Sequence, residues 1–105
     1  MCGIAGLLDT RLDAHVDSNV ISRMVDAITH RGPDDSGIYN GGQLALGTRR
    51  LKIIDLDGGH QPMSARNGAL QITFNGEIYN YRELREQLLA GGRRFVSESD
   101  TEVLL

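Results

Sequence analysis

The sequence predicts a single small domain of the α+β class, and three observations lead to this prediction. The chain has 105 residues, which is enough for one modest hydrophobic core. Its 13 glycines exceed the average share of about 7%, and six of them form three pairs between apolar segments, where turns between short elements are expected. Apolar residues alternate in some segments and recur at helical spacing in others, so both strands and helices are expected.

The chain begins with an expected strand and an expected helix. Residues 3–8 are small or apolar, which predicts a buried strand that starts next to the terminus. Asp17 or Ser18 can cap the helix that follows, and Gly32 with Pro33 ends it. Its apolar positions recur at helical spacing and are Ile21, Met24, Val25 and Ile28.

Turns and short strands alternate in the middle of the chain. Pro, Asp, Ser and Gly predict the turns, and the apolar runs between them predict the strands. Asn40-Gly41-Gly42 is a hairpin signal between two of these strands. The expected order is a loop over 31–37, strands over 37–39, 43–48 and 51–54, a loop over 55–61 and a half-buried strand over 70–74.

A second helix is expected after residue 80. Asn80 can cap it, and Gly91 can serve as the residue that ends it. Glu83 can close a capping box with Asn80, and Tyr79 can pack on Leu84 as a hydrophobic staple. These features predict a helix of about three turns.

A third helix start lies at the end of the chain. Ser99 to Glu102 repeat the capping-box pattern directly before three apolar residues. A helix of about one turn is unstable alone in water. The sequence therefore predicts that residues 1–105 are the N-terminal part of a longer chain.

Composition excludes several classes of protein. The chain has 14 acidic and 11 basic residues, a net charge of −3 and no basic block, which argues against binding of nucleic acid. No apolar run approaches the about 20 residues that span a bilayer, and no signal peptide is visible, so a cytoplasmic protein without membrane contact is expected. One cysteine and three histidines without ligand spacing predict no metal site; the histidines are His15, His30 and His60.

Cys2 has two interpretations. A free cysteine is most often a small buried hydrophobe. If Met1 is removed, however, Cys2 carries both a thiol and a free α-amino group. The reference pKa of an α-amino group lies within about one unit of that of a thiol, so the amine can accept the thiol proton at neutral pH. Nucleophile and base would then belong to one residue, as in enzymes with N-terminal nucleophiles.

Other residues could complete a site for an amino acid. Asn75 and Gly76 follow the expected strand over 70–74 and could present an amide and a backbone N–H to a developing oxyanion, although Asn-Gly is also the commonest hairpin turn. Arg50 could hold a carboxylate bidentately, while Glu77 and Asp100 could receive an ammonium. For any one charged residue taken alone, a solvated surface role is the more frequent one.

Five motifs, taken together and in order, resemble the glutaminase domain of glutamine-hydrolysing asparagine synthetases. They are Met1-Cys2-Gly3-Ile4-Ala5-Gly6, Arg31-Gly32-Pro33-Asp34-Asp35-Ser36-Gly37, Arg50-Leu51-Lys52-Ile53-Ile54-Asp55-Leu56, Asn75-Gly76-Glu77-Ile78-Tyr79-Asn80 and Ser99-Asp100-Thr101-Glu102-Val103. The resemblance spans essentially the whole chain. Pro33 and the segment that begins at Arg49 favour this branch over amidotransferases that make glucosamine phosphate or phosphoribosylamine. Thr48 departs from the family, in which a histidine is frequent at this position.

The resemblance implies a class II glutamine amidotransferase domain of the N-terminal-nucleophile hydrolase type. Its fold would be a four-layer α/β/β/α sandwich, incomplete over residues 1–105. Cys2 would be the catalytic nucleophile, and Asn75 with the Gly76 N–H would form the oxyanion hole. The residues implied in substrate binding are Arg50 at the α-carboxylate, Glu77 and Asp100 at the α-amino end, Asn75 and Gly76 again, and Leu51, Lys52, Ile53 and Ile54 chiefly through their backbone.

The implied reaction hydrolyses L-glutamine to glutamate and ammonia through a glutamyl thioester on Cys2. Ammonia would feed the synthesis of asparagine from aspartate in a C-terminal synthetase domain of the same chain. That domain, and not residues 1–105, would use ATP and Mg²⁺, because no Walker-type phosphate loop is present here. The full-length protein could be a homodimer, and residues 1–105 alone would be weakly active or inactive.

Two alternatives stay open at this level. Members of this branch amidate or cyclise other carboxylates, so the acceptor of the ammonia is not fixed. A non-catalytic ligand-binding or scaffold domain of the same fold would retain Met1 and use Cys2 only for packing.

Overall fold

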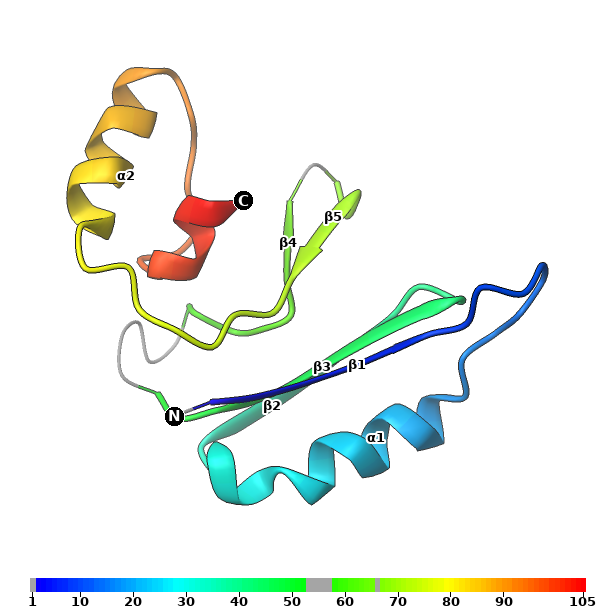
Figure 1. Ribbon diagram of the computed structural model, residues 1–105. Coiled ribbons are helices and arrows are strands. Elements are labelled where there is room, and N and C mark those ends of the chain that lie inside the picture. The colour runs from blue at the N-terminus through cyan, green and yellow to red at the C-terminus, as the bar shows by residue number, and fades with distance from the viewer. Residues whose placement is uncertain (1, 53–57, 66) are drawn as a thin grey trace.

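A computed structural model describes residues 2–52, 58–65 and 67–105. It contains helices and antiparallel sheets, which confirms the α+β class (Figure 1). The elements in chain order are β1 (Gly3–Leu8), α1 (Ser18–Ala27), η1 (Thr29–Arg31), β2 (Asp35–Asn40), β3 (Leu44–Arg50), β4 (Met63–Ala65), β5 (Leu70–Ile72), α2 (Tyr81–Ala90) and η2 (Asp100–Leu104), where η denotes a 3₁₀ helix.

The larger sheet has the strand order β1-β3-β2, and all neighbours are antiparallel. Strand β3 is central and pairs with β1 from Gly3↔Arg49 to Leu8↔Leu44. Strands β2 and β3 form a hairpin across the expected turn, in which Gly41 N–H donates to the Leu44 carbonyl at 2.8 Å. The end of the central strand thus lies next to the start of β1, where Cys2 is found (Figure 1).

Helix α1 covers one face of this sheet and forms the apolar core with it. Ile21 and Val25 of the helix are 0% and 2% exposed and pack with Ala45 of β3. A Cβ on Gly47 would lie only 2.2 Å from a Val25 methyl group, so the absence of a side chain lets the helix approach the strand closely. Asp17, one of the two predicted caps, caps the helix by accepting from Asn19 N–H at 2.8 Å.

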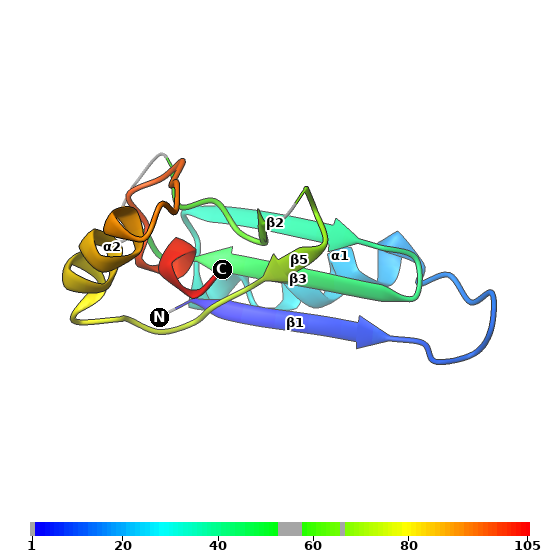
Figure 2. The ribbon, with the colours of Figure 1, turned by 90° about the horizontal axis from the view of Figure 1, so that it is seen from above.

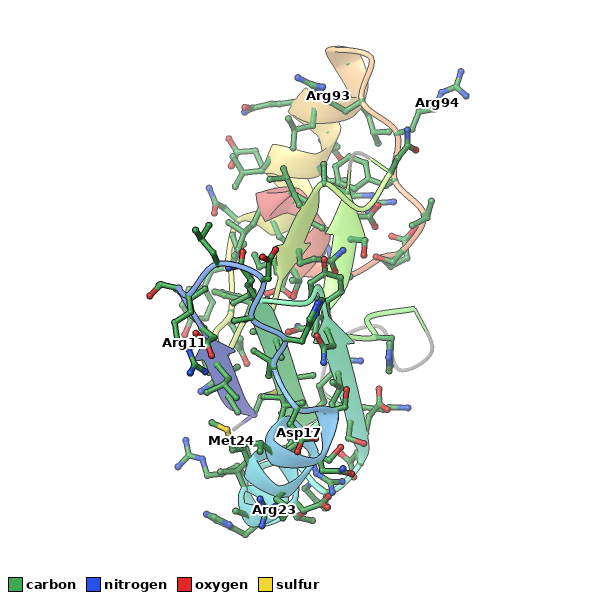
Figure 3. All side chains as sticks on the ribbon, turned by 90° about the vertical axis from the view of Figure 1, so that its right-hand side faces the viewer. Arg11, Asp17, Arg23, Met24, Arg93 and Arg94 are labelled. Atoms are coloured by element: carbon green, nitrogen blue, oxygen red, sulfur yellow. The ribbon has the colours of Figure 1, made fainter. Side chains whose placement is uncertain are left out.

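The other face of the sheet meets a two-stranded hairpin made of β4 and β5. Figures 1 and 2 show this hairpin on the side opposite α1, with α2 and η2 beyond the end of the sheet near the N-terminus. Figure 3 shows Arg93 and Arg94 extending from the turn after α2, at the end of the molecule away from α1. Across the described ranges, no helix is both long and apolar enough to cross a membrane.

Several predicted strand boundaries were wrong. Asp35 and Ser36 belong to β2 and not to a loop, because they pair with the end of β3. The described residues of the expected 51–54 strand, Leu51 and Lys52, are not in a strand, and residues 53–57 lie outside the described part of the chain. The expected 70–74 strand ends at Ile72, since the Phe74 N–H donates to the Gln61 side chain instead of a neighbouring strand.

The helix ends also differ from prediction. Helix α1 stops at Ala27 and continues only as the 3₁₀ turn η1. Asn80 occupies the N-cap position of α2 but forms no capping hydrogen bond, and Tyr79 is 93% exposed, so the predicted staple does not form. Gly92, and not Gly91, has the left-handed backbone after this helix, with φ of 86°.

The last helix start is confirmed in part. Ser99 caps η2, but it accepts from Thr101 N–H and not from the third residue of the helix. The Glu102 carboxylate bonds to the backbone N–H groups of Val96 and Ser97, both at 2.8 Å, in place of the Ser99 N–H that a capping box requires.

Candidate functional site

A cavity of about 350 Å³ lies where the start of β1, the end of β3, the segment after β5 and η2 come together. Its volume suits a small amino acid. Seven of the predicted site residues line it, although they come from four separate stretches of the sequence: Cys2, Arg50, Leu51, Asn75, Gly76, Glu77 and Asp100.

Three predicted residues are not placed in this cavity. Lys52 is described but does not line it; its backbone N–H instead donates to Asp34 Oδ2 at 2.9 Å. Ile53 and Ile54 lie outside the described residues, so their predicted part in binding is not tested.

The cavity is also lined by five residues that the sequence analysis did not predict: Gln61, Phe74, Tyr79, Ser99 and Thr101. Phe74, Tyr79, Ser99 and Thr101 are immediate or near neighbours of predicted residues, and the motifs already quoted contain three of them. Gln61 has no such signal, because it enters the cavity from a loop without periodicity.

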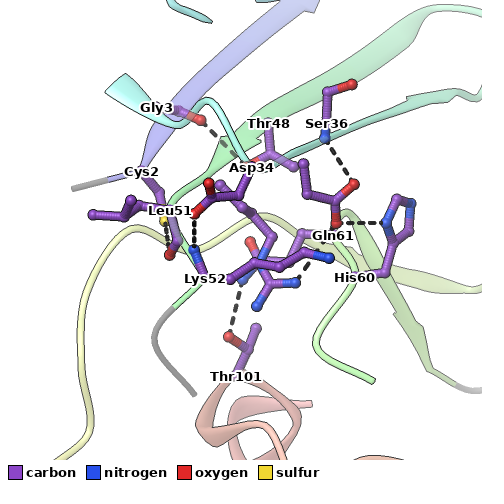
Figure 4. Close-up of polar contacts among 12 residues, drawn as sticks. Cys2, Gly3, Asp34, Ser36, Thr48, Leu51, Lys52, His60, Gln61 and Thr101 are labelled. Atoms are coloured by element: carbon purple, nitrogen blue, oxygen red, sulfur yellow. Dashed lines mark hydrogen bonds and ion pairs between the residues drawn. The ribbon is translucent and has the colours of Figure 1, made fainter. Parts of the chain in front are cut away.

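The Cys2 thiol lies directly before β1 and forms one hydrogen bond, and a second bond holds the backbone of the next residue, Gly3 (Figure 4). Its Sγ donates to the Leu51 carbonyl at 3.7 Å. The buried Thr48 hydroxyl donates to the carbonyl of the adjacent Gly3 at 3.2 Å. Thr48, at the position where the sequence departs from the family pattern, therefore anchors the residue that follows Cys2.

Arg50 is the last residue of β3 and is 5% exposed. Alternation along the strand places it on the face opposite α1, while Arg49 points toward the helix and forms an ion pair with Asp26 at 2.8 Å. Arg50 Nη1 is buried without a hydrogen-bond partner, because Asp35 Oδ2 is 3.7 Å away and attracts it only through charge. A buried guanidinium with an unused donor is suited to a carboxylate ligand.

The loop before β2 holds the backbone beside Arg50. Asp34 N–H donates to the Arg50 carbonyl at 3.0 Å, and the Asp34 carboxylate accepts from Lys52 N–H. Asp35 lies opposite Arg50 in the sheet, and its Oδ2 is 3.1 Å from His60 Nδ1. Burial alone would raise the pKa of Asp35, but hydrogen bonds from His60 and Ser36 and the charges of His60 and Lys52 outweigh it, so this pKa is lowered.

Two carboxylates face the cavity. Asp100 is 6% exposed and its Oδ2 accepts from Ile78 N–H at 3.0 Å, which leaves the second oxygen for a ligand. Glu77 lines the same cavity and is exposed. One guanidinium and two carboxylates around a cavity of this size match the two charges of an α-amino acid.

Among the residues that the structure describes, no group of three or more His, Cys, Asp or Glu side chains could hold a metal ion. What the cavity offers is a thiol, a side-chain amide, a glycine N–H and fixed charges, and this is the set of groups used in amide hydrolysis by a covalent route.

Comparison with known proteins agrees with this geometry. The family model described as "Glutamine amidotransferase domain" matches residues 1–105, and the chain therefore belongs to this family. It is 46% identical over 107 residues to "Asparagine synthetase [glutamine-hydrolyzing] 1" and 40% identical over 107 residues to "Asparagine synthetase [glutamine-hydrolyzing] 3", both of Bacillus subtilis (strain 168). Each alignment covers 100% of this chain and 17% of the relative.

A more distant relative gives the same result. The chain is 38% identical over 104 residues to "Asparagine synthetase [glutamine-hydrolyzing] 1" of Arabidopsis thaliana, which covers 99% of this chain and 18% of the relative. The chain thus spans less than a fifth of the length of these relatives.

Proposed function

We propose that this domain hydrolyses L-glutamine to glutamate and ammonia, with Cys2 as the nucleophile after removal of Met1. The observation that carries the proposal is the cavity itself, in which the thiol shares one small space with Asp100 and with the buried guanidinium of Arg50, whose Nη1 has no hydrogen-bond partner. In the bound substrate, the α-carboxylate would pair with Arg50 and the α-ammonium with Asp100 and Glu77. The side-chain amide would then extend toward Cys2.

The chemistry follows from the groups around the thiol. The free α-amino group of Cys2 takes the thiol proton, and the thiolate attacks the amide carbon of glutamine. Asn75 and the Gly76 N–H stabilise the resulting oxyanion, where each aligned donor contributes about 3 kcal/mol. The intermediate breaks its C–N bond, ammonia leaves with the proton from the α-ammonium of Cys2, and a glutamyl thioester remains. Water hydrolyses the thioester, which releases glutamate and restores the thiol.

The ammonia is proposed to serve a second domain, which lies outside residues 1–105 and amidates aspartate to asparagine. This rests on the names of the relatives, of whose length the chain covers 14% to 19%. ATP and Mg²⁺ would be bound by that domain. An unpaired thiol nucleophile stays reduced in the cytoplasm, which we propose as the location.

The finer fold is proposed to be the four-layer α/β/β/α sandwich. The face of the large sheet that α1 does not cover carries Ile4, Leu8 and Leu44, which are 52%, 64% and 38% exposed. A second sheet packed on this face would bury them. Residues 1–105 expressed alone should therefore be poorly soluble, and a soluble monomer with full glutamine turnover would contradict this.

The central test is the Cys2→Ala variant of the natural full-length protein. It should lose glutamine hydrolysis and still use added ammonia for synthesis, because the thiol acts only in the first reaction. Mass spectrometry of the wild-type protein treated with a chloroketone analogue of glutamine should find one adduct on a terminus that begins at Cys2.

Other outcomes would separate the alternatives. A protein that retains Met1 and binds glutamine without turnover would be the non-catalytic domain. Hydrolysis of glutamine with no asparagine formed, but with another carboxylate amidated, would keep the glutaminase and change the acceptor. Equal loss of glutamine- and ammonia-dependent synthesis in Cys2→Ala would contradict a separate glutaminase.

A further inference from the structure

Gln61 is buried in the wall of the cavity and has no role in the reaction proposed above. It is 4% exposed, and both ends of its side-chain amide bind other parts of the protein. Its Oε1 accepts from Phe74 N–H at 2.7 Å, and its Nε2 donates to the Thr101 hydroxyl at 3.0 Å, the bond drawn in Figure 4. A backbone N–H can only donate, so Phe74 fixes which end of the amide carries the oxygen.

The two partners of Gln61 adjoin the two sides of the candidate site. Phe74 directly precedes Asn75, and Thr101 directly follows Asp100. The Gln61 side chain therefore connects the segment proposed to bind the oxyanion with the segment proposed to bind the ammonium. Phe74 and Thr101 are 27 residues apart in the sequence, and a bond from Ile78 N–H to Asp100 also joins the two segments.

Gln61 is itself held against the large sheet. Its carbonyl lies so close to Gly37 of β2 that a Cβ on Gly37 would overlap it. Gly37 pairs with Thr48, the residue that anchors the carbonyl next to Cys2. Gln61 is thus positioned against the sheet whose strands also position Arg50 and the residue next to Cys2.

The Thr101 end belongs to a chain of hydrogen bonds at the start of η2. Thr101 N–H donates to the Ser99 hydroxyl at 3.2 Å, and Ser99 N–H donates to Ser97 Oγ at 3.3 Å. The Ser97 hydroxyl donates to the Glu102 carboxylate at 2.5 Å. The three residues whose hydroxyl groups form this chain are all buried: Ser97, Ser99 and Thr101. Hydrogen bonds within the turn therefore hold it in place independently of its bond to Gln61.

We propose that Gln61 is a positioning residue for amide hydrolysis, which sets Asn75 and Gly76 at their working distance from Asp100. The proposal rests on the glutaminase function argued above. Gln61 acts through its partners, because both ends of its amide already hold protein groups. Displacing the oxyanion donors should lower kcat more than it raises KM, since these donors act on the transition state.

The test compares variants in the natural full-length protein. Gln61→Met keeps the length of the side chain and removes both hydrogen bonds. Gln71→Met is the matched control, because Gln71 bonds Ser64 and Gly68 within the β4–β5 hairpin and does not line the cavity. Thr101→Val removes only the second bond, whereas Thr101→Ser keeps the hydroxyl.

Rates are divided by the number of sites that form the chloroketone adduct, so that unfolded molecules are not counted. Gln61→Met should lower kcat/KM at least about tenfold, most of it in kcat, as misplacement by a fraction of an ångström does. Gln71→Met should match the wild type. Thr101→Val should lower kcat and Thr101→Ser should largely restore it. Gln61→Met and Thr101→Val together should be less than additive, because they break one shared link.

Three results would overturn the role of Gln61 and leave the glutaminase intact: wild-type rates per adduct-forming site in Gln61→Met, equal losses in Gln61→Met and Gln71→Met, or full additivity with Thr101→Val. The function itself fails in a different way, namely if the wild-type protein forms no adduct on Cys2 and releases no glutamate. Thr101→Val is close to isosteric, so it tests the link even if Gln61→Met does not fold.

Discussion

Around α1 the buried residues are apolar, whereas around the cavity they are mostly polar. Ile21, Val25 and Ala45 fill the space between helix and sheet. At the other end, the side chains that are less than a tenth exposed include Arg50, Gln61, Ser97, Ser99, Asp100 and Thr101. Apolar burial is non-directional, but hydrogen bonds specify distances and angles. The first region therefore provides stability, and the second provides the geometry that the proposed reaction needs.

Substitutions in the two regions should therefore have different effects, chiefly on stability around α1 and chiefly on geometry around the cavity. A smaller residue in the apolar region leaves a void and weakens folding, but the polar region and its distances survive. Loss of one hydrogen bond near the cavity should cost little folding free energy and should shift a group of the proposed site. Three variants can break or sharpen this contrast.

The largest loss of stability is expected from Ile21→Ala. Ile21 is 0% exposed under the sheet, so truncation should lower the free energy of unfolding by about 2–5 kcal/mol. Hydrogen exchange of the amides in α1 and β3 measures this locally. Turnover per adduct-forming site should not change, and Arg23→Ala, on the exposed side of the same helix, should alter neither quantity. A folded Ile21→Ala protein with impaired turnover per site would break the contrast.

A smaller effect on stability, but a real one on rate, is expected from Thr48→Val. The variant keeps the shape of a fully buried residue and removes the hydroxyl that donates to the Gly3 carbonyl. Stability should fall by about 1 kcal/mol, and kcat should fall because Gly3 adjoins the proposed nucleophile, Cys2. Thr48→Ser retains the donor and should keep more of the rate. If the two variants have the same kcat, the hydroxyl does not position Cys2.

The smallest effect concerns acid stability. The pKa of Asp35 is lowered in the folded protein, so its ionised form contributes stability that is present above its unfolded pKa, about 4, and is lost as the pH falls through the lower folded value. Asp35→Asn should therefore show a shallower loss of stability below about pH 4 in urea unfolding. Asp13→Asn, an exposed loop residue, serves as control. If the free energy of unfolding falls equally steeply below about pH 4 in Asp35→Asn and the wild type, protonation of Asp35 is not coupled to folding.

The same contrast explains what the sequence could predict. The bounds of β1 follow from apolar periodicity and are confirmed, and local capping chemistry narrowed the cap of α1 to Asp17 or Ser18, of which the structure has Asp17. The end of β5 could not be predicted, because it depends on a bond between Phe74 and the distant Gln61. The strand β4 was missed because its three residues, Met63–Ala65, are too few to show alternation.

Some residues of the candidate site could be predicted only from complete motifs and not from single residues. Cys2, Asn75 and Asp100 are ordinary residues one at a time, and the order of the motifs singled them out. Two neighbouring arginines lie at the end of β3, and no local signal separates Arg49 from Arg50. Their separation requires the pairing of the sheet, which sends one to Asp26 of the helix and the other to the cavity.

The two arginines show that alternate residues of β3 face opposite sides of the sheet. Ala45 and Gly47 face helix α1, whereas Thr48 and Arg50 face the side of the sheet where the cavity lies. The strand therefore contributes alternate residues to the apolar core and to the candidate site. Deleting one residue between Ala45 and Thr48 would move every later residue of the strand to the opposite face, so that Thr48 and Arg50 would face the helix and Leu51 would take the place of Arg50 beside the cavity. Relatives of this chain should therefore carry no insertion or deletion within β3.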